Sequence, residues 1–366
     1  MKRQIIILLF SFSILPAFAG HETGNEAHEE SAELNVKELI LDHIGDGYGW
    51  HITTFGHNHV SIPLPIIVKG KESGWHLFSS SRLGHGHEYK GFSIALEDPY
   101  KGKLVEKIPA ANEQGYEVIR PWDFSITKNA ASLLLSSLVL ICLGLSCSRW
   151  YKKREGQADS VSPKGFIAFV EMVIMSVVDD IIKPCVGKNY KRYVPYLLTV
   201  FFFVIFNNLL GLVPIFPGGA NVTGNIAITS VLAVCTLIIV NVYGTKEYWK
   251  EIFWPDVPVW LKVPIPIMPA IELVGVFTKP FALMIRLFAN ILAGHSIVLG
   301  LVCMVFLTVR LGAAMNTGMS ILAVVMVVFI SCVELLVAYI QAYVFTMLSA
   351  VFIGLSQVEP HHSHKK

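Results

Sequence analysis

The chain has 366 residues, of which 53% are hydrophobic and 15% charged, with a formal net charge of +2. Soluble domains carry about a quarter charged residues, so this composition excludes an ordinary soluble protein and indicates an integral membrane protein. This net charge says little about partners, and we expect no nucleic-acid partner.

The N-terminus has the layout of a secretory signal. A basic start is followed by an apolar run and then by Ala17, Phe18 and Ala19. Such segments are cut off after export, so residues 1–19 are predicted to be a signal peptide. The alternative is an uncleaved membrane helix, for which the run is short. Export would place the next segment outside the cytoplasm.

Residues 20–120 differ in composition from the rest of the chain. They are polar, rich in Gly and His, and contain stretches such as HITTFGHNHVSIPLPIIV that alternate as strands do. We therefore expect a small β-rich extracytoplasmic domain. All six cysteines lie beyond it, so it has no disulfide framework.

Two histidine pairs in this domain are weak candidates for a transition-metal site: His57 with His59, and His85 with His87. Histidine is a common zinc ligand, but these spacings match no diagnostic pattern. Polar segments also hold histidine without binding metal. We predict no metal site and no cofactor.

Residues 121–356 form the predicted membrane domain. Apolar runs predict five transmembrane helices, at residues 129–147, 194–212, 226–242, about 269–308 and about 319–355. The last two are near forty residues, whereas about twenty cross a bilayer, so we expect both to be tilted or curved.

Charges fix the predicted orientation of these helices. Arg149, Lys152, Lys153 and Arg154 follow the first run, which places that end in the cytoplasm. This agrees with an exported N-terminus. Residues 166–184 carry Glu171, Asp179 and Asp180, so we expect an amphipathic helix on the cytoplasmic surface rather than a span.

The predicted fold class is an all-α polytopic membrane protein with five transmembrane helices and one cytoplasmic-surface amphipathic helix. A small β-rich N-terminal extracytoplasmic domain precedes it. Residues 357–366 form a polar cytoplasmic tail. The predicted location is a bacterial cytoplasmic (inner) membrane, with the mature N-terminus periplasmic and the C-terminus cytoplasmic.

Polar residues inside the last two helices are the strongest functional signal. Glu272, Lys279 and Arg286 recur every seven residues and share one helix face, with Asn290 one turn beyond Arg286. An arginine within a membrane costs between about 2.5 and 17 kcal/mol, so it is retained only where it faces protein or water. His295 lies roughly 14 Å further along the helix than Arg286.

The final helix supplies matching polar residues. Glu334 and Gln341 are seven residues apart and share a face, with Glu334 outward of Gln341 by roughly 10 Å. The two antiparallel helices therefore predict an inner layer of Arg286, Asn290 and Gln341, and an outer layer of His295 and Glu334. A histidine beside a carboxylate can pass a proton near neutral pH, whereas arginine serves as a fixed charge.

A structural role is the alternative for these residues. Asn290 and Gln341 can act as hydrogen-bonding glue between helices. Lys279 and Glu272 lie nearer the cytoplasmic end, where long side chains can extend to the membrane surface.

Several segments resemble one known family. RLFANILAGH and ELLVAYIQAYVF closely resemble the a subunit of F-type ATP synthases, as do PWDFSITKN and FNNLLGLVP. The resemblance covers roughly residues 120–356. It implies that Arg286 faces a rotating ring of c subunits, where it meets a carboxylate on each passing helix and blocks leakage between two half-channels.

The resemblance also implies roles for the other residues. Asn290 and Gln341 would line the arginine site, and Glu272 would be a weaker candidate near the cytoplasmic half-channel. Many members have Glu at the position of His295 and His at that of Glu334, so the pair is exchanged here, an arrangement also seen within the family. Implied partners are the c ring, the b-subunit peripheral stalk and the rest of the synthase, within a lipid bilayer.

No phosphate-cradling loop is present, so this chain is not expected to bind ATP or to be an enzyme on its own. One rival interpretation is a secondary transporter with a metal-capturing ectodomain, but such folds often have internal repeats and none is visible. A purely structural membrane scaffold is a third interpretation, which Arg286 argues against.

Overall fold

The computed structural model describes residues 45–55, 58–71, 73–95, 100–109, 116–153, 163–213, 218–254 and 267–357. The chain divides into two units, residues 1–35 and 36–366, and every described residue belongs to the second. The predicted signal peptide, His57 and the tail beyond Gln357 lie outside the described residues, as do the side chains of His59 and His85.

The predicted β-rich region is confirmed as strand-forming. Its strands are β1 (Gly49–Phe55), β2 (Asn58–Pro63), β3 (Pro65–Gly70), β4 (Gly74–Ser79), β5 (Phe92–Ile94), β6 (Leu104–Pro109), β7 (Tyr116–Ile119) and β8 (Trp122–Asp123). They pair antiparallel in three small sheets, ordered β1-β2, β4-β3-β8 and β5-β6-β7.

Alternation along the strands builds the core of this region. On β3, Ile66 and Val68 are fully buried and pack with Phe78 of β4 and Phe92 of β5. This is the half-buried pattern expected of a strand with one face on a core. On β3 the core is therefore built from every second residue, whereas on β5 the consecutive residues Phe92 and Ser93 are both buried.

Tyr48 closes one side of this core. Its hydroxyl donates a hydrogen bond to the carboxylate of Asp123 and accepts one from the backbone N–H of Leu104, at 3.2 Å. Burial raises the pKa of the Tyr48 phenol, and the bond to Asp123 raises it further. The neutral phenol thus joins two segments far apart in sequence.

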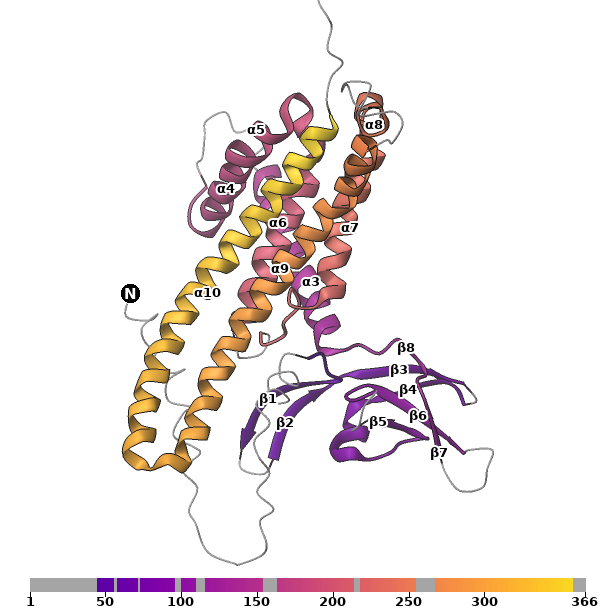
Figure 1. Ribbon diagram of the computed structural model, residues 1–366, viewed down its shortest axis with the longest axis vertical. Coiled ribbons are helices and arrows are strands. Elements are labelled where there is room, and N and C mark those ends of the chain that lie inside the picture. The colour runs from indigo at the N-terminus through magenta and orange to yellow at the C-terminus, as the bar shows by residue number, and fades with distance from the viewer. Residues whose placement is uncertain are drawn as a thin grey trace, which may run out of the picture. The chain divides into compact units, whose positions relative to one another are not determined.

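Residues 128–356 are mostly helical (Figure 1). The helices are α3 (Lys128–Lys152), α4 (Phe166–Ser176), α5 (Lys183–Val186), α6 (Tyr190–Leu212), α7 (Ile226–Val242), α8 (Lys246–Phe253), α9 (Ile267–Thr308) and α10 (Ala313–Ser356). Four described stretches are long and apolar enough to cross a membrane, or five if α7 and α8, bent by 101°, form one span. The expectation of a mostly helical membrane domain is confirmed.

The acidic segment after α4 departs from simple helical geometry. Residues Val177–Ile182 form a π-helical turn, which no sequence pattern predicted. It buries Val177, Ile181 and Ile182 while Asp179 and Asp180 stay exposed. One-sided burial is consistent with the predicted amphipathic character, because the acids need not leave water.

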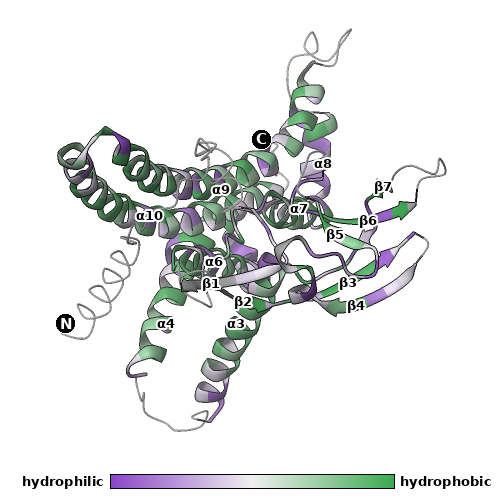
Figure 2. Cartoon of the chain, turned by 90° about the horizontal axis from the view of Figure 1, so that it is seen from below, coloured by the Kyte–Doolittle hydropathy of each residue, from purple (hydrophilic) through white to green (hydrophobic). Residues whose placement is uncertain are grey.

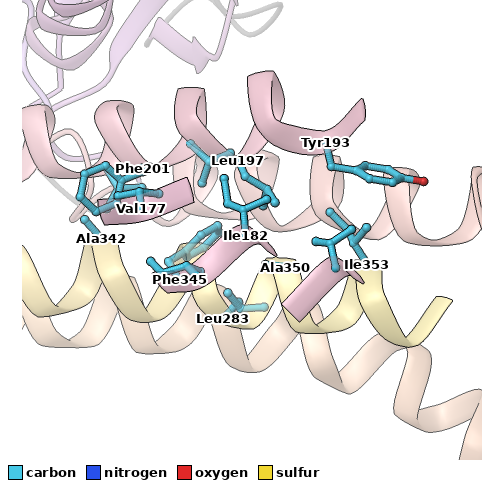
Figure 3. Close-up of a cluster of buried hydrophobic side chains, with 14 of the residues drawn as sticks. Val177, Ile182, Tyr193, Leu197, Phe201, Leu283, Ala342, Phe345, Ala350 and Ile353 are labelled. Atoms are coloured by element: carbon cyan, nitrogen blue, oxygen red, sulfur yellow. The ribbon is translucent and has the colours of Figure 1, made fainter. Parts of the chain in front are cut away.

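The main helical core lies between this π-helical turn, α6 and α10. Figure 3 shows Leu197 and Phe201 of α6 beside Ala342 and Phe345 of α10, with Ile182 between them. Small and large side chains alternate, which lets the helices approach closely. This packing holds the C-terminal part of α10, from Ala338 to Ile353, against α6.

The last two helices are long, as predicted. At 1.5 Å per residue, α9 and α10 extend about 63 and 66 Å, roughly twice the hydrocarbon thickness of a bilayer. The helix α9 continues through Pro280. A turn at Val309–Leu311 and Gly312, at φ +103°, reverses the chain so that α10 lies alongside α9 (Figure 1).

Candidate functional site

His295 of α9 and Glu334 of α10 meet where the two long helices pack together. Nδ1 of His295 lies 3.5 Å from Oε1 of Glu334, and the side chains are 22% and 15% exposed. Helix geometry predicted this juxtaposition. A largely buried imidazole next to a carboxylate can hold or pass one proton between the two groups.

Gly294 makes room for this pair. A Cβ at this position would lie only 2.2 Å from Oε1 of Glu334 and 3.0 Å from its Cδ. Any larger residue would therefore displace the carboxylate. Oε1 of Glu334 is buried and has no hydrogen-bond partner within the described part of the chain. A carboxylate oxygen that has no hydrogen-bond donor at a helix interface can accept a hydrogen bond from a water molecule or can carry a transferable proton.

Arg286 and Asn290 lie on an uncovered face of α9. Both are exposed, whereas Leu283, Leu287 and Ile291 on the neighbouring face are buried against other helices. Across the ranges that the structure describes, no carboxylate forms an ion pair with Arg286. The guanidinium is thus directed away from the body of this chain.

Gln341 lies on the covered side of α10. It is 6% exposed, and the adjacent Ala338 and Ala342 are fully buried. Among the described residues, no hydrogen bond links Gln341 to Arg286 or Asn290. The inner layer of Arg286, Asn290 and Gln341 therefore stays a prediction, because Arg286 and Asn290 are exposed on α9 while Gln341 is buried on α10.

Asn208 of α6 fixes the level of α10 between Glu334 and Gln341. Its Nδ2 donates to the backbone carbonyl of Ala338 at 3.2 Å, and the residue is 2% exposed. Sequence reasoning gave Asn208 no role. The position of Asn208 near the end of an apolar helix was the one sign in the sequence that it could have a role. Its partner could not be predicted, because that partner is a backbone carbonyl, which no sequence pattern marks.

A second polar chain crosses the helices nearer the C-terminus of α10. The hydroxyl of Tyr196 lies 2.8 Å from Oγ1 of Thr236, which in turn lies 3.4 Å from Oγ of Ser349. Side-chain hydrogen bonds of this kind join neighbouring helices in lipid. These three residues join α6, α7 and α10, and sequence reasoning missed them.

Lys279 lies beside a small cavity between α7, α8, α9 and α10. The cavity holds about 20 Å³ and is lined in part by Thr236, Tyr248 and Lys279. This is enough for about one water molecule. The ammonium of Lys279 lies 5.9 Å from the ring centre of Phe352. Glu272, two turns earlier on α9, is half-buried.

Of the four weak metal candidates, only His87 has its side chain within the part of the chain that the structure describes. No group of three or more His, Cys, Asp or Glu side chains lies close enough there to hold a metal ion. His87 is exposed.

Residues 131–354 match the family described as ATP synthase A chain. This matched segment contains every residue of the site. The chain belongs to this family. The resemblance recognised in RLFANILAGH is thereby confirmed.

Curated relatives agree with this assignment. The chain is 35% identical over 323 residues to ATP synthase subunit a of Chlorobium phaeobacteroides, covering 84% of this chain and 87% of that protein. It is 32% identical to the subunit a of an Anaeromyxobacter species over 96% of this chain and 76% of that protein. For Myxococcus xanthus the identity is 41%, over 66% of this chain and 75% of that protein.

The strand region has its own match. Residues 39–124 match a domain of unknown function. The segment that matches the ATP synthase A chain family therefore begins shortly after this domain ends, close to the start of α3.

Proposed function

We propose that the chain is the a subunit of the membrane sector of an F-type ATP synthase, forming two ion half-channels beside a ring of c subunits. The observation that carries this proposal is Arg286. It is a fixed cation on an exposed face of a long apolar helix, two and a half turns from a partly buried His–Glu pair.

Arg286 is the barrier between the half-channels. An unpaired guanidinium in lipid is costly, and no carboxylate among the described residues pairs with Arg286, so we assign its counter-charge to a neighbouring subunit. A carboxylate on a passing ring helix would supply that charge and would be held ionised beside Arg286. Because arginine does not release its proton, it can attract the carboxylate without carrying protons across itself.

The His295–Glu334 pair belongs to the outward half-channel. A proton on this pair would be passed to the ring carboxylate, which becomes neutral before it enters lipid, where the ionised form is too costly. Asn290, exposed on α9 between Arg286 and Gly294, lies along this path. Gln341 lines the facing helix.

The cytoplasmic half-channel begins near Lys279 and Glu272. The water-sized cavity beside Lys279 lies about 10 Å along α9 from Arg286. Pro280 lacks a backbone N–H, which leaves the carbonyl of Val276 without its usual helical partner next to this cavity. A free carbonyl and a lysine supply polar groups at this end.

In this function the chain is not an enzyme by itself. It couples ion flow to ring rotation, and ATP is made elsewhere in the complex. Its partners are the c ring, the b-subunit peripheral stalk and the remaining synthase subunits, in a bacterial inner membrane with the N-terminus periplasmic and the C-terminus cytoplasmic. The family match gives no support to the alternative of a secondary transporter.

ATP-driven ion uptake into vesicles containing the whole synthase tests the proposal, measured with and without sodium to identify the ion. Arg286→Ala should abolish coupled uptake while the complex still assembles. Arg310→Ala is the matched control, because Arg310 is an exposed arginine in the turn after α9. Normal coupled uptake by Arg286→Ala would refute the assignment.

A further inference from the structure

The β4-β3-β8 sheet has two unlike faces. Its inner face carries Ile66, Val68 and Phe78, which are buried in the core of the strand region. An antiparallel sheet with one face on a core normally carries polar side chains on the other face, where it meets water. Here the outer face is apolar and aromatic instead.

Four large side chains make up this outer face. Trp75 is 61% exposed, Leu77 71%, Trp122 73% and Phe124 56%. Singly exposed apolar residues are common on soluble proteins, but a contiguous apolar patch marks an interaction site. We call these four residues the aromatic face.

Strand register places the four residues together. Leu77 pairs with Ile67 of β3, while Trp75 and Trp122 flank Lys69 from opposite sides. The rings of Trp75 and Phe124 lie 5.7 Å apart, and the ammonium of Lys69 lies 5.7 Å from the Trp75 ring. Tryptophan, phenylalanine and one lysine are the composition of a surface that meets lipid headgroups.

The aromatic face is held close to the start of a membrane helix. Phe124 precedes Lys128, the first residue of α3, by four residues, which reach at most about 14 Å. Phe124 also donates its backbone N–H to Ile67, and Lys128 donates its own to Gly47, at 2.9 and 2.8 Å. These bonds tie both β3 and the segment before β1 to the helix entry.

The helix α3, which is hydrophobic over most of its length (Figure 2), is long enough for that entry to lie in the headgroup layer. Its 25 residues extend about 37 Å, whereas the hydrocarbon core is about 30 Å thick. Leu134, Leu138 and Ile141 are exposed along it, as lipid-facing residues would be. Phe124 lies within about 14 Å of this entry and Trp122 within about 21 Å, so this edge of the aromatic face can reach the headgroup layer.

We propose that the aromatic face is a membrane-docking surface that inserts into the lipid interface where α3 enters the bilayer. The strand region, which matches the domain of unknown function, would then be docked on the outer surface of the membrane. Trp75 and Trp122 would lie at headgroup depth, and Lys69 would contact lipid phosphates. This proposal does not depend on the ion-channel role of the membrane helices.

Tryptophan quenching by brominated lipid tests this docking. The full chain would be placed in vesicles of phosphatidylcholine brominated at acyl carbons 6 and 7, and in unbrominated vesicles. The contribution of each tryptophan is the difference in emission between the unchanged chain and the Trp75→Phe or Trp122→Phe variant. Trp50→Phe is the matched control, because Trp50 is 4% exposed and packs against Ala220 and Val222.

We expect bromine to reduce the emission of Trp75 and Trp122 by about half or more, as for residues at the membrane interface, and to leave that of Trp50 nearly unchanged. The proposal would be overturned if bromine left the emission of Trp75 and Trp122 unchanged while aqueous acrylamide quenched it, because the face would then be in contact with water. The proposal would also be overturned if acrylamide quenched both residues in the isolated chain but not in the assembled synthase, because the face would then bind another subunit. Near-ultraviolet circular dichroism would establish that each variant is folded.

Discussion

The carboxylate of Glu334 occupies the space that any side chain at Gly294 would need. Its Oε1 lies 2.2 Å from the position of a Cβ on Gly294 and 3.5 Å from Nδ1 of His295. The absence of a side chain at one residue thus positions the acid beside the histidine that follows in sequence. This contact connects the two longest helices at the point where proton transfer is proposed.

Gly294→Ala should therefore impair proton transfer more than folding. The added methyl group meets the end of a flexible side chain, which can rotate away, so Glu334 is expected to leave His295 while the helices stay packed. We predict about a tenfold loss of ATP-driven proton uptake, smaller than the roughly hundredfold or larger effect of a general acid–base group, because the displaced carboxylate is still present. Gly300→Ala is the control on the same helix, because a Cβ there meets open space. Equal uptake by the two variants would show that the position of Glu334 is unimportant.

Exchanging the two ionisable residues tests whether they work as a pair. His295→Glu and Glu334→His are each expected to lower proton uptake, because each leaves two like groups facing one another. The double variant restores one histidine and one carboxylate at 3.5 Å and should recover more activity than either single variant. A double variant less active than both would exclude direct coupling.

Gly354 of α10 is predicted to be essential for stability. A Cβ there would lie 2.0 Å from the backbone carbonyl oxygen of Cys185. Because backbone atoms cannot rotate aside, Gly354→Ala should separate α10 from α5 and cost about 1–3 kcal/mol, as other overpacked sites do. Thermal unfolding of the full chain in detergent measures this. Gly318→Ala, which meets open space on the same helix, should leave the melting temperature unchanged or raise it.

The strand region should lose stability at alkaline pH through Tyr48. Because the pKa of Tyr48 is raised in the folded state above its usual value of 10.0, the unfolded phenol ionises first as pH increases. The stabilisation is thus complete below pH 10.0 and falls above it. Limited proteolysis of the full chain between pH 9 and 11 should show faster cleavage of this region above about pH 10.

Tyr48→Phe cannot ionise, so it should lose most of this pH dependence while being less stable at neutral pH. Tyr116→Phe is the control, since Tyr116 is exposed in the same region. If Tyr116→Phe had the same effect as Tyr48→Phe, the hydrogen bond to Asp123 would not be the cause.

The helical periodicities were legible from sequence because they depend on local geometry. Arg286 and Asn290 share a face whatever surrounds them, and the pairing of His295 with Glu334 follows once two helices of similar length run antiparallel. The lengths of α9 and α10 were likewise predicted from their long apolar runs, and α9 continues through Pro280, the residue that suggested a break. The family resemblance then supplied the roles proposed for these residues.

The contacts that position those residues required the tertiary structure. Close packing joins Gly294 to Glu334 and Gly354 to the backbone of Cys185, and a glycine in sequence does not reveal which atom approaches it. The same holds for the backbone carbonyl that accepts from Asn208, the π-helical turn at Val177–Ile182 and the outward direction of Trp75 and Trp122. Helix faces and lengths were set by local sequence, whereas the spacing of His295 and Glu334 was set by how closely α9 and α10 approach.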